Sequence, residues 1–506
     1  MSNTNKPTNL LDILEAGGPE DIAIKNTDGQ QTTYASLYYA IESIGKQLRR
    51  MGIRREDKVA ITIPNSIDTI ITFLGVSCYA IAAPMNPSYK TEEFRFFLED
   101  TEAKAIITDK QGNKAIHEAA LEGTIHISID SEADGNIVLS NDSSNVYSYE
   151  TDKPNAEHVA LVLHTSGTTS RPKMVPLTHG NLTSSIHNIV DTYKLQPNDV
   201  SLCAMPLFHV HGLVASTLST LASGGTVLVP HGFNPFNFLR IGQSQPFTWY
   251  SSVPSIHKAI LSRAKGNPTP YKLPSLRFIR SCSSALAPEI MTELEELFDV
   301  PVLEAYGMTE ASHQMSSNPM PPATRLPGSV GQATGIQISI MDEKGNMEPP
   351  KSRGEVVIKG PNIFHGYEHN SEANASSFTN GWFRTGDEGM LNDNGYLTLL
   401  GRLKEIINRS GEKISPQEID EILLSHPAVA EAVTFGIPHS IHGEEPSAAV
   451  VLSDSVTEAE LTRFCREYLA DFKCPRVIHI VDQIPRTATG KIQRRLVAET
   501  MTKIIN

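Results

Sequence analysis

The sequence predicts an α/β protein with a large N-terminal part and a small C-terminal part. The first observation is an alternation of apolar strands and amphipathic helices in the N-terminal region, which is typical of a parallel sheet covered by helices. The second is a change of pattern near residues 401–413, after which about a hundred residues show their own succession of helices and strands. The third is the length of 506 residues with 40% apolar side chains, enough for more than one packed core.

The N-terminal region opens with helices and strands in alternation. Apolar residues recur at helical spacing over residues 33–51, and Gly52 follows as a C-cap, so we expect an amphipathic helix there. Buried strands are expected at 59–63 and 105–108, with a largely apolar helix over 67–82 between them. This order of elements predicts a parallel sheet.

A hydroxyl-rich loop follows the next expected strand. Residues 122–156, which precede this strand, are polar and rich in Asp, Asn, Ser and Glu. We expect them to form a segment at the periphery of the fold. The apolar strand ends at Thr165, and residues 165–173 read Thr-Ser-Gly-Thr-Thr-Ser-Arg-Pro-Lys, a composition suited to wrapping phosphates. The spacing does not fit the Walker A pattern G-x-x-x-x-G-K-[ST]. A clamp on a triphosphate and an ordinary surface turn therefore both remain open from this loop alone.

Two histidines and a run of small residues mark the middle of the chain. A helix expected at 178–193 precedes His209-Val-His211, which suggests either metal ligands or a pocket wall. We favour the wall, because no third ligand lies nearby in the sequence. A strand expected at 276–279 then enters the small residues 281–285, which allow a planar ligand to approach the backbone closely.

Two carboxylates follow at positions that suggest nucleotide chemistry. A helix expected at 287–298 precedes residues 301–310, and Glu310 at the end of that stretch could hold Mg²⁺ beside a phosphate. Asp387 comes after a turn glycine, Gly386, and could accept hydrogen bonds from both ribose hydroxyls.

The C-terminal residues form a shorter pattern of their own. We expect a helix opened by Ser415 with Pro416 at N1 and Glu418 at N3, strands near 428–435 and 448–452, and a helix opened by Thr457 with Glu460 at N3. The pair Gly490-Lys491 lies in a Thr- and Gly-rich loop before a final helix. Taken alone, Lys491 is an ordinary solvated lysine.

Composition excludes several classes of protein. With 43 basic and 57 acidic residues the formal charge is −14, which argues against nucleic acids and anionic membranes as general partners. The five cysteines have no C-x-x-C spacing, which favours reduced thiols over a zinc site. We find no signal peptide, no apolar run long enough for a membrane span and no S-K-L type signal at the C-terminus, so we expect a cytoplasmic protein.

Five segments together resemble the adenylate-forming superfamily of acyl-CoA synthetases, luciferases and peptide-synthetase adenylation domains. They are Thr165–Lys173, Glu304–Glu310, Thr385–Asp387, Gly401–Lys413 and Pro485–Lys491. The resemblance implies a large AMP-binding domain of α/β sheets over residues 1–401. It also implies a small mobile α+β domain over 402–506 that rotates about a hinge at Lys404 and carries the adenylation lysine, Lys491.

The same resemblance implies an AMP-forming acid–thiol ligase that uses ATP, Mg²⁺ and CoA, and it implies roles for individual residues. The residues that would bind ATP are Thr165, Ser166, Gly167, Thr168, Thr169, Lys173, Ser283, Ser284, Glu304, Ala305, Tyr306, Thr309, Asp387, Arg402 and Lys491. The catalytic residues would be Lys491, Thr309, Glu310 and His209, with Thr168 and Glu310 near Mg²⁺. The CoA-binding residues would be Ser410, Gly411 and Glu412.

The acid is suggested by four segments that resemble the oxalate–CoA ligases of plants and fungi. These are Arg280–Pro288, Met308–Pro319, Ile407–Ser415 and Ala470–Pro475. A second carboxylate needs hydrogen-bond donors at the end of its pocket, whereas a fatty or aromatic acid needs an apolar slot. The acyl-pocket candidates are polar: His209, Ser281, Ser283 and His313. Oxalate is therefore the first expectation and malonate the second.

Other functions remain as alternatives. One is an adenylating ligase for another short-chain, medium-chain or aromatic acid, or one with a carrier-protein thiol as acceptor. Another, from a different class, is a non-catalytic nucleotide- or RNA-binding protein of the same fold. Lys491, Glu310 and Asp387 favour catalysis. The expected partners are a small carboxylic acid and CoA, with no stable nucleic acid and no membrane, in a monomer or homodimer.

Overall fold

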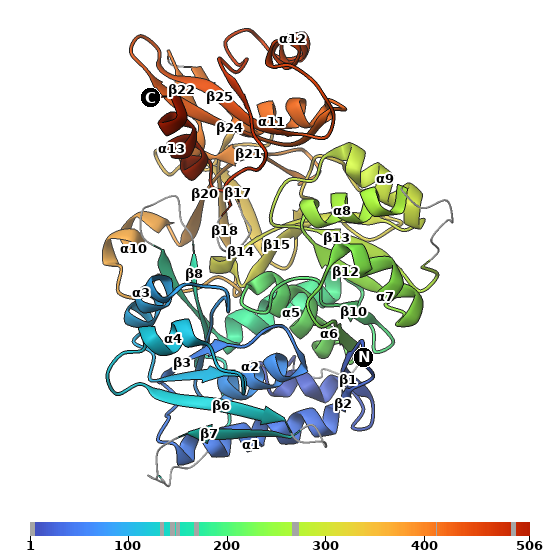
Figure 1. The fold of residues 1–506 in the computed structure, drawn as a ribbon, viewed down its shortest axis with the longest axis vertical. Helices are drawn as coiled ribbons and strands as arrows, with labels where there is room; N and C mark the ends of the chain where they lie inside the picture. Colours follow the sequence, from blue (N-terminus) through green and yellow to red (C-terminus); the bar gives the residue numbers. More distant parts are fainter. Residues whose placement is uncertain are drawn as a thin grey trace. The chain divides into compact units, whose positions relative to one another are not determined.

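The computed structural model describes residues 6–131, 136–141, 147, 152–165, 172–265, 273–410, 412–486 and 492–505 (Figure 1). The chain divides into two compact units. The first comprises residues 1–338 and 358–381, and the second comprises residues 339–357 and 382–506. The predicted domain boundary between residues 401 and 402 separates parts that would rotate about Lys404. This boundary stays a prediction.

A seven-stranded sheet in the first unit has the order β7-β6-β5-β3-β4-β8-β9. Its strands are β3 (Lys58–Thr62), β4 (Ile81–Pro84), β5 (Ala105–Thr108), β6 (Ile125–Ser131), β7 (Ile137–Asn141), β8 (Val159–Thr165) and β9 (Lys173–Thr178). The inner pairs are parallel, and only the outermost strands, β7 and β9, pair antiparallel to their neighbours. The predicted parallel α/β sheet is confirmed.

Two expectations in this region need correction. The apolar helix predicted over residues 67–82 is α2 (Ile67–Tyr79), because Ala80 has an extended backbone with φ −149° and β4 begins immediately afterwards. The run is apolar throughout, so hydrophobic periodicity could not show where the helix ends. The described part of the polar residues 122–156 includes two strands that were not predicted, β6 and β7, at one edge of the sheet.

A nine-stranded sheet completes the framework of the first unit, in the order β16-β15-β14-β13-β12-β10-β11-β1-β2. Its strands are β1 (Ile22–Asn26), β2 (Gln31–Thr33), β10 (Val200–Leu202), β11 (Thr226–Val229), β12 (Trp249–Ser252), β13 (Phe278–Ser281), β14 (Val302–Met308), β15 (His313–Ser317) and β16 (Gln332–Ala333). Because β12, β13 and β14 are parallel, their carboxyl ends meet at one edge.

The helices of the first unit are α1 (Tyr34–Arg50), α2, α3 (Thr91–Thr101), α4 (Lys114–Ala119), α5 (His179–Tyr193), a π-helical segment (His211–Leu218), α6 (Ser219–Ala222), α7 (Phe238–Ser244), α8 (Pro254–Lys265), α9 (Pro288–Phe298) and α10 (Ser371–Ser377), with the short strand β19 (Phe378–Thr379) after α10. They include the four that the sequence predicted, which are α1, α2, α5 and α9. One core is formed by α7, α8 and α9 against β12 and β13, around Phe238, Tyr250 and Leu294.

The second unit contains two smaller sheets. One is formed by β17 (Gln337–Met341), β18 (Gly354–Lys359), β20 (Trp382–Leu391) and β21 (Leu397–Arg402). The other has the order β23-β22-β25-β24 with β26 beside β25, and its strands are β22 (Ile407–Arg409), β23 (Glu412–Ile414), β24 (Val429–His439), β25 (Gly443–Leu452) and β26 (Ile478–Ile480).

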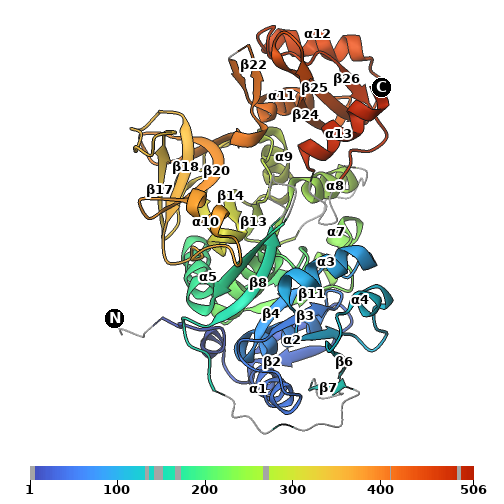
Figure 2. The same ribbon diagram turned by 90° about the vertical axis from the view of Figure 1, so that its left-hand side faces the viewer.

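Helices cover both faces of this second sheet, as Figure 2 shows. Ile419 of α11 (Pro416–Ser425) and Leu461 of α12 (Glu458–Tyr468) share one apolar cluster with Val450. Val497 of α13 (Arg494–Ile505) lies in a separate cluster with Val433. Alternate residues of β24 and β25 thus serve two cores, as the side-chain period of a strand requires.

The two predicted caps in this unit have different outcomes. Thr457 and Glu460 form the predicted capping box of α12. Ser415 makes no side-chain cap of α11, because its hydroxyl donates to the carbonyl of Leu400 instead. Among the residues that the structure describes, no helix is long and apolar enough to cross a membrane.

Candidate active site

Two of the polar residues expected around the acyl group, Ser281 and Ser283, lie at or just beyond the carboxyl end of β13 in the first unit. Ser281 ends β13, where it is the register partner of both Ser252 on β12 and Glu304 on β14. Ligands of open α/β sheets bind at this edge of a sheet. Glu304 is buried and its Oε1 accepts a hydrogen bond of 2.9 Å from the Leu286 amide, so it fixes the turn that follows β13.

That turn holds Ser283 in an unusual backbone conformation. Ser283 has φ +72°, in the left-handed region where residues other than glycine are uncommon. Its hydroxyl lies 3.0 Å from Nδ1 of His211, whose ring stacks on the ring of His313 with centroids 5.2 Å apart. His313 is itself strained, with φ +107°. Strain of this kind clusters at functional sites, which supports the pocket assignment of Ser283 and His313.

The histidine in contact with these residues is His211, which the sequence analysis assigned with His209 to a pocket wall but did not include among the acyl-pocket candidates. His209 is half-buried, and its ring lies against Phe208 with centroids 4.7 Å apart. The spacing His209-Val-His211 could not distinguish the two rings. His211 begins the π-helical segment, a rare conformation that is frequent at functional sites, but no sequence pattern predicts it.

The remaining ATP-pocket candidates of the first unit lie on or beside β14. Ala305 and Tyr306 are buried within the strand, and Thr309 opens the single helical turn that follows it. Ser284 is exposed, and its hydroxyl donates to the carbonyl of Ser283 over 2.8 Å. Ala305, Tyr306 and Thr309 therefore follow Glu304 along β14 and the turn after it, whereas Ser284 lies in the turn after β13.

Glu310 and the lysine of the phosphate loop meet through a tyrosine. Glu310 is buried, and its Oε1 accepts a 2.8 Å hydrogen bond from the hydroxyl of Tyr367. The Nζ of Lys173 lies 4.5 Å from the centre of the same tyrosine ring. Tyr367 was missed by the sequence analysis because it lies far along the chain from both partners.

The surroundings of Glu310 fit a bound Mg²⁺. In the described part of the chain, no Lys, Arg or His nitrogen lies within ion-pair distance of this buried carboxylate. A buried carboxylate needs a counter-charge, and a divalent cation with oxygen ligands would supply one.

The ends of the phosphate loop are described, but its centre is not. Thr165 on β8 is the register partner of Lys173 on β9, and its hydroxyl lies 3.5 Å from the Lys173 carbonyl. The predicted phosphate ligands Ser166, Gly167, Thr168 and Thr169 lie outside the described residues, as do Gly411 and Lys491. Their roles stay predictions.

The predicted ribose contacts lie in the second unit, where they pair with each other. Asp387 on β20 and Arg402 on β21 are register partners, and Nε of Arg402 lies 2.8 Å from Oδ1 of Asp387. Gly386, which the sequence predicted to form a turn before Asp387, lies within β20 instead and has φ +74°. Both residues line a small cavity of about 110 Å³.

The predicted hinge and CoA-binding residues lie farther along the same unit. Lys404 is exposed in the single helical turn Leu403–Glu405. Ser410 sits at the turn between β22 and β23 with φ +52°, and its amide donates to the carbonyl of His442 over 2.8 Å. Glu412 is exposed at the start of β23.

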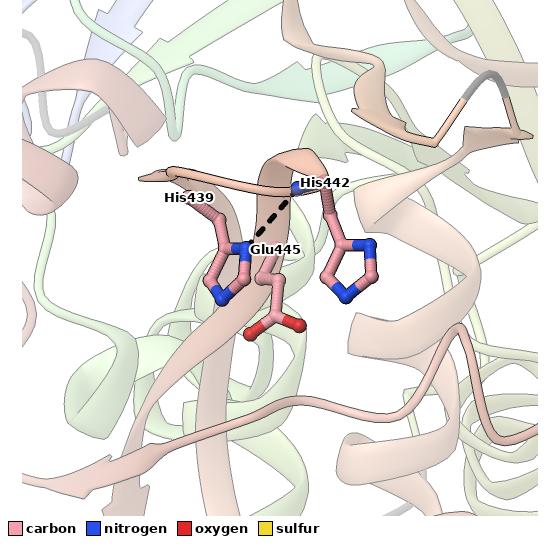
Figure 3. A group of neighbouring side chains, drawn as sticks. All are labelled: His439, His442 and Glu445. Atoms are coloured by element: carbon pink, nitrogen blue, oxygen red, sulfur yellow. Dashed lines mark hydrogen bonds between the residues drawn. The ribbon is translucent and has the colours of Figure 1, made fainter.

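One group of possible metal ligands occurs near this turn: His439, His442 and Glu445 (Figure 3). The backbone amide of His442 donates to Nδ1 of His439, and the carboxylate of Glu445 already faces Arg409 at 3.2 Å and Arg476 at 3.8 Å. Two arginines compete with a cation for the one carboxylate of the group. We therefore assign no metal to it.

Comparisons with known proteins agree over nearly the whole chain. A family model described as AMP-binding enzyme matches residues 15–368, and one described as AMP-binding enzyme C-terminal domain matches residues 418–491. The chain is 46% identical over 502 residues to the oxalate–CoA ligase of Arabidopsis thaliana, covering 97% of both chains. It is 46% identical over 479 residues to the oxalate–CoA ligase of Saccharomyces cerevisiae, covering 89% of this chain and 88% of the yeast protein.

Solved structures show the same fold. The crystal structure of ATP-bound MatB from Rhodopseudomonas palustris superimposes with a TM-score of 0.88 and 29% identity, covering 99% of this chain and all of that one. The o-succinylbenzoate CoA synthetase MenE from Bacillus subtilis, solved with ATP and magnesium ion, gives a TM-score of 0.84 and 29% identity over 97% of this chain and 99% of that one.

Proposed function

Since the chain belongs to the AMP-binding enzyme family, we propose that it is an ATP-dependent acid–CoA ligase whose acid is oxalate. The observation that carries the choice of acid is the 46% identity to oxalate–CoA ligases from a plant and a yeast. The polar surroundings of Ser283 and His313 support the same choice, because a second carboxylate requires donors where a fatty acid would require apolar contacts.

The reaction would proceed in two steps. An oxygen of one oxalate carboxylate attacks the α-phosphorus of ATP, the new P–O bond forms, and the bond to the bridging oxygen of pyrophosphate breaks. The CoA thiol then loses its proton and attacks the carbonyl carbon of the adenylate, and AMP leaves. The first step is needed because a free carboxylate would have to expel oxide, whereas the adenylate expels AMP.

This chain's own residues would hold the reactants. Lys173, Thr165 and the loop between them would bind the β- and γ-phosphates, and Asp387 and Arg402 the ribose. Glu310 would hold Mg²⁺ together with Thr168, and the metal would offset phosphate charge. Lys491 would stabilise charge on the α-phosphate during adenylation. His209 stays a proposed catalytic residue.

The proposal extends to partners and location. The formal charge of −14 supports the expectation that no nucleic acid is a stable partner. A monomer or homodimer and a cytoplasmic location stay predictions, which sedimentation and cell fractionation would test.

The decisive experiment is an ATP–pyrophosphate exchange assay with a panel of acids, repeated as thioester formation with CoA. Oxalate should give the highest kcat/KM, above malonate, succinate, acetate, a long-chain fatty acid and a hydroxycinnamate. Strong turnover of the fatty acid would overturn the oxalate assignment. Absence of exchange with every acid would favour a non-catalytic nucleotide-binding protein.

A variant of the pocket sharpens the choice of acid. His313→Ala should reduce kcat/KM for oxalate more than for acetate or another acid without a second carboxylate, by about tenfold or more, because the second carboxylate loses a partner. An unchanged ratio between the two acids would show that His313 has only a structural role.

A further inference from the structure

Arg280 is a cation with no exposed surface at the carboxyl end of β13, next to the pocket candidate Ser281. Its guanidinium donates three hydrogen bonds to neutral side chains. Nε bonds the hydroxyl of Tyr193 at 2.8 Å, Nη1 bonds the hydroxyl of Ser251 at 2.9 Å, and Nη2 bonds Oε1 of Gln314 at 3.0 Å.

The charge of this guanidinium has no anionic partner among the residues that the structure describes. In the part of the chain that the structure describes, no carboxylate lies within ion-pair distance of Arg280. Burial raises the pKa of the Tyr193 phenol, so that neighbour stays neutral. An unpaired buried charge destabilises the folded protein, so its presence beside a pocket requires a reason other than stability.

Ser251 lies between Arg280 and His211, and its bond with Arg280 decides the direction in which its hydroxyl donates to His211. An arginine nitrogen can only donate, so the Ser251 oxygen accepts from Nη1 and its hydrogen is left to donate elsewhere. In the described structure the other hydrogen bond of this hydroxyl joins it to Nε2 of His211 at 2.7 Å. Since Ser251 is fully buried, Nε2 must accept that hydrogen or leave it unsatisfied.

The direction of this bond fixes the tautomer of His211. With Nε2 accepting, the neutral ring carries its hydrogen on Nδ1, which then donates to the hydroxyl of Ser283 at 3.0 Å. The nearby Arg280 cation disfavours a second positive charge on the ring. The Ser283 hydroxyl therefore has its own hydrogen available to donate outward, and Ser283 is half-buried whereas the rest of the chain of bonds is buried.

We propose that Arg280, Ser251 and His211 form a one-directional hydrogen-bond relay that turns the Ser283 hydroxyl into a donor for a substrate carboxylate. The three are positioning residues, and Ser283 is the group that would touch the acid. The relay places the field of a buried cation behind the carboxylate site, which favours an acid with two negative charges over one with a single charge. The proposal rests on the acid–CoA ligase function for its substrate, but its hydrogen-bond direction is a property of the free protein.

The tautomer of His211 can be read directly by ¹⁵N NMR of the full chain labelled on histidine. Two-bond ¹⁵N–¹H correlations distinguish an imidazole protonated on Nδ1 from one protonated on Nε2, and the His211→Asn variant identifies the signal. At neutral pH we expect His211 protonated on Nδ1 alone, and a mixed or Nε2 pattern in Ser251→Ala. A wild-type ring protonated on Nε2 or on both nitrogens would overturn the relay, whether or not the protein activates oxalate.

Arg280→Met tests the start of the relay in the same way, and it should also disturb the Nδ1 pattern. A folded Arg280→Met protein that keeps a pure Nδ1 pattern would remove Arg280 from the relay. Ser251→Ala keeps the test decisive if the arginine variant fails to fold.

Kinetics provide the second measurement. Ser251→Ala should raise KM for oxalate about tenfold, the effect of one well-formed hydrogen bond, and leave KM for ATP unchanged. Ser251→Thr retains the hydroxyl and should restore KM for oxalate. Ser219→Ala is a matched control, because Ser219 is equally buried but donates to the carbonyl of Ala215 within a helix. Equal KM values for oxalate in Ser251→Ala and Ser219→Ala would contradict the proposal.

Discussion

Single side chains in the first unit join groups that lie far apart in the sequence. Tyr367 contacts Glu310 through its hydroxyl and Lys173 through its ring, so one residue positions both a proposed metal carboxylate and a proposed phosphate cation. Arg280 has a similar role behind Ser283. Because these contacts are set by the fold and not by a local motif, the sequence alone could not show either role, although Arg280 begins one of the segments that resemble the oxalate–CoA ligases.

The two functions of Tyr367 can be separated by substitution. Tyr367→Phe keeps the ring beneath Lys173 and removes the hydrogen bond to Glu310, so we expect a higher Mg²⁺ concentration for half-maximal adenylation and a several-fold lower rate. Tyr367→Leu removes the ring as well and should also raise KM for ATP. Titrations of Mg²⁺ and ATP in the exchange assay check both. Identical behaviour of the two variants would show that the contact of the ring with Lys173 has no effect on ATP binding.

Two buried histidines should make the protein sensitive to acid. Burial lowers the pKa of His179 to about 3 and that of His257 to about 4, whereas an unfolded histidine titrates near ~6.5. Below pH 6.5 the unfolded chain therefore takes up protons that the folded one does not. The contribution of these two neutral histidines to the free energy of unfolding is fully present above pH 6.5 and is lost as pH falls towards 3. Between pH 7 and 5 the free energy of unfolding falls by roughly 2 kcal/mol per histidine.

His179→Asn isolates this effect. Nδ1 of His179 accepts a hydrogen bond from the Leu10 amide over 3.1 Å, and the Asn side-chain oxygen can replace that acceptor without titrating. The midpoint of thermal unfolding should fall less between pH 7 and 5 in this variant than in the wild-type protein. The same acid dependence in both would exclude His179 as a cause.

Secondary-structure elements were predictable where a cap or a periodic apolar face marks them. Helices α1, α5 and α12 begin within a residue of their predicted starts, because Thr33, Thr178 and Thr457 each accept a bond from the first turn. The end of α2 and the strands within residues 122–156 could not be located in this way, since one run is uniformly apolar and the other mostly polar. The end of β8 at Thr165, where the phosphate loop begins, was predicted correctly. The function of that loop could be inferred only together with the other segments.

The capping box of α12 gives a test at this scale. The hydroxyl of Thr457 accepts from the Glu460 amide at 3.3 Å, and Glu460 accepts in return from the Thr457 amide at 2.9 Å. Thr457→Ala should destabilise the second unit by about 1 kcal/mol and leave the rate of adenylation unchanged. Urea unfolding followed on the second unit, with an unchanged midpoint for Thr457→Ala, would contradict the assignment.

At the scale of the whole molecule, the proposed ATP contacts are divided between the two compact units. Lys173 and Glu310 belong to the first, whereas Asp387, Arg402 and Lys491 belong to the second. The order of these segments along the sequence was enough to indicate the family. It could not show which residues surround each of them, because buried neighbours such as Ser251 and Tyr367 come from elements outside the motifs.

The variant Lys491→Ala tests whether the protein uses two different conformations for its two half-reactions. Lys491→Ala should lower the rate of adenylation by on the order of 10²–10³, the effect of losing one donor to the transition state. It should leave thioester formation from supplied oxalyl-adenylate and CoA nearly unchanged, because a rotation about Lys404 would remove Lys491 from the reacting atoms before the thiol attacks. Arg495→Ala is the matched control, since Arg495 is an exposed cation of the same segment that pairs with Glu499. Pyrophosphate exchange measures the first step and thioester formation the second, so equal losses in both would exclude a lysine that acts in only one arrangement.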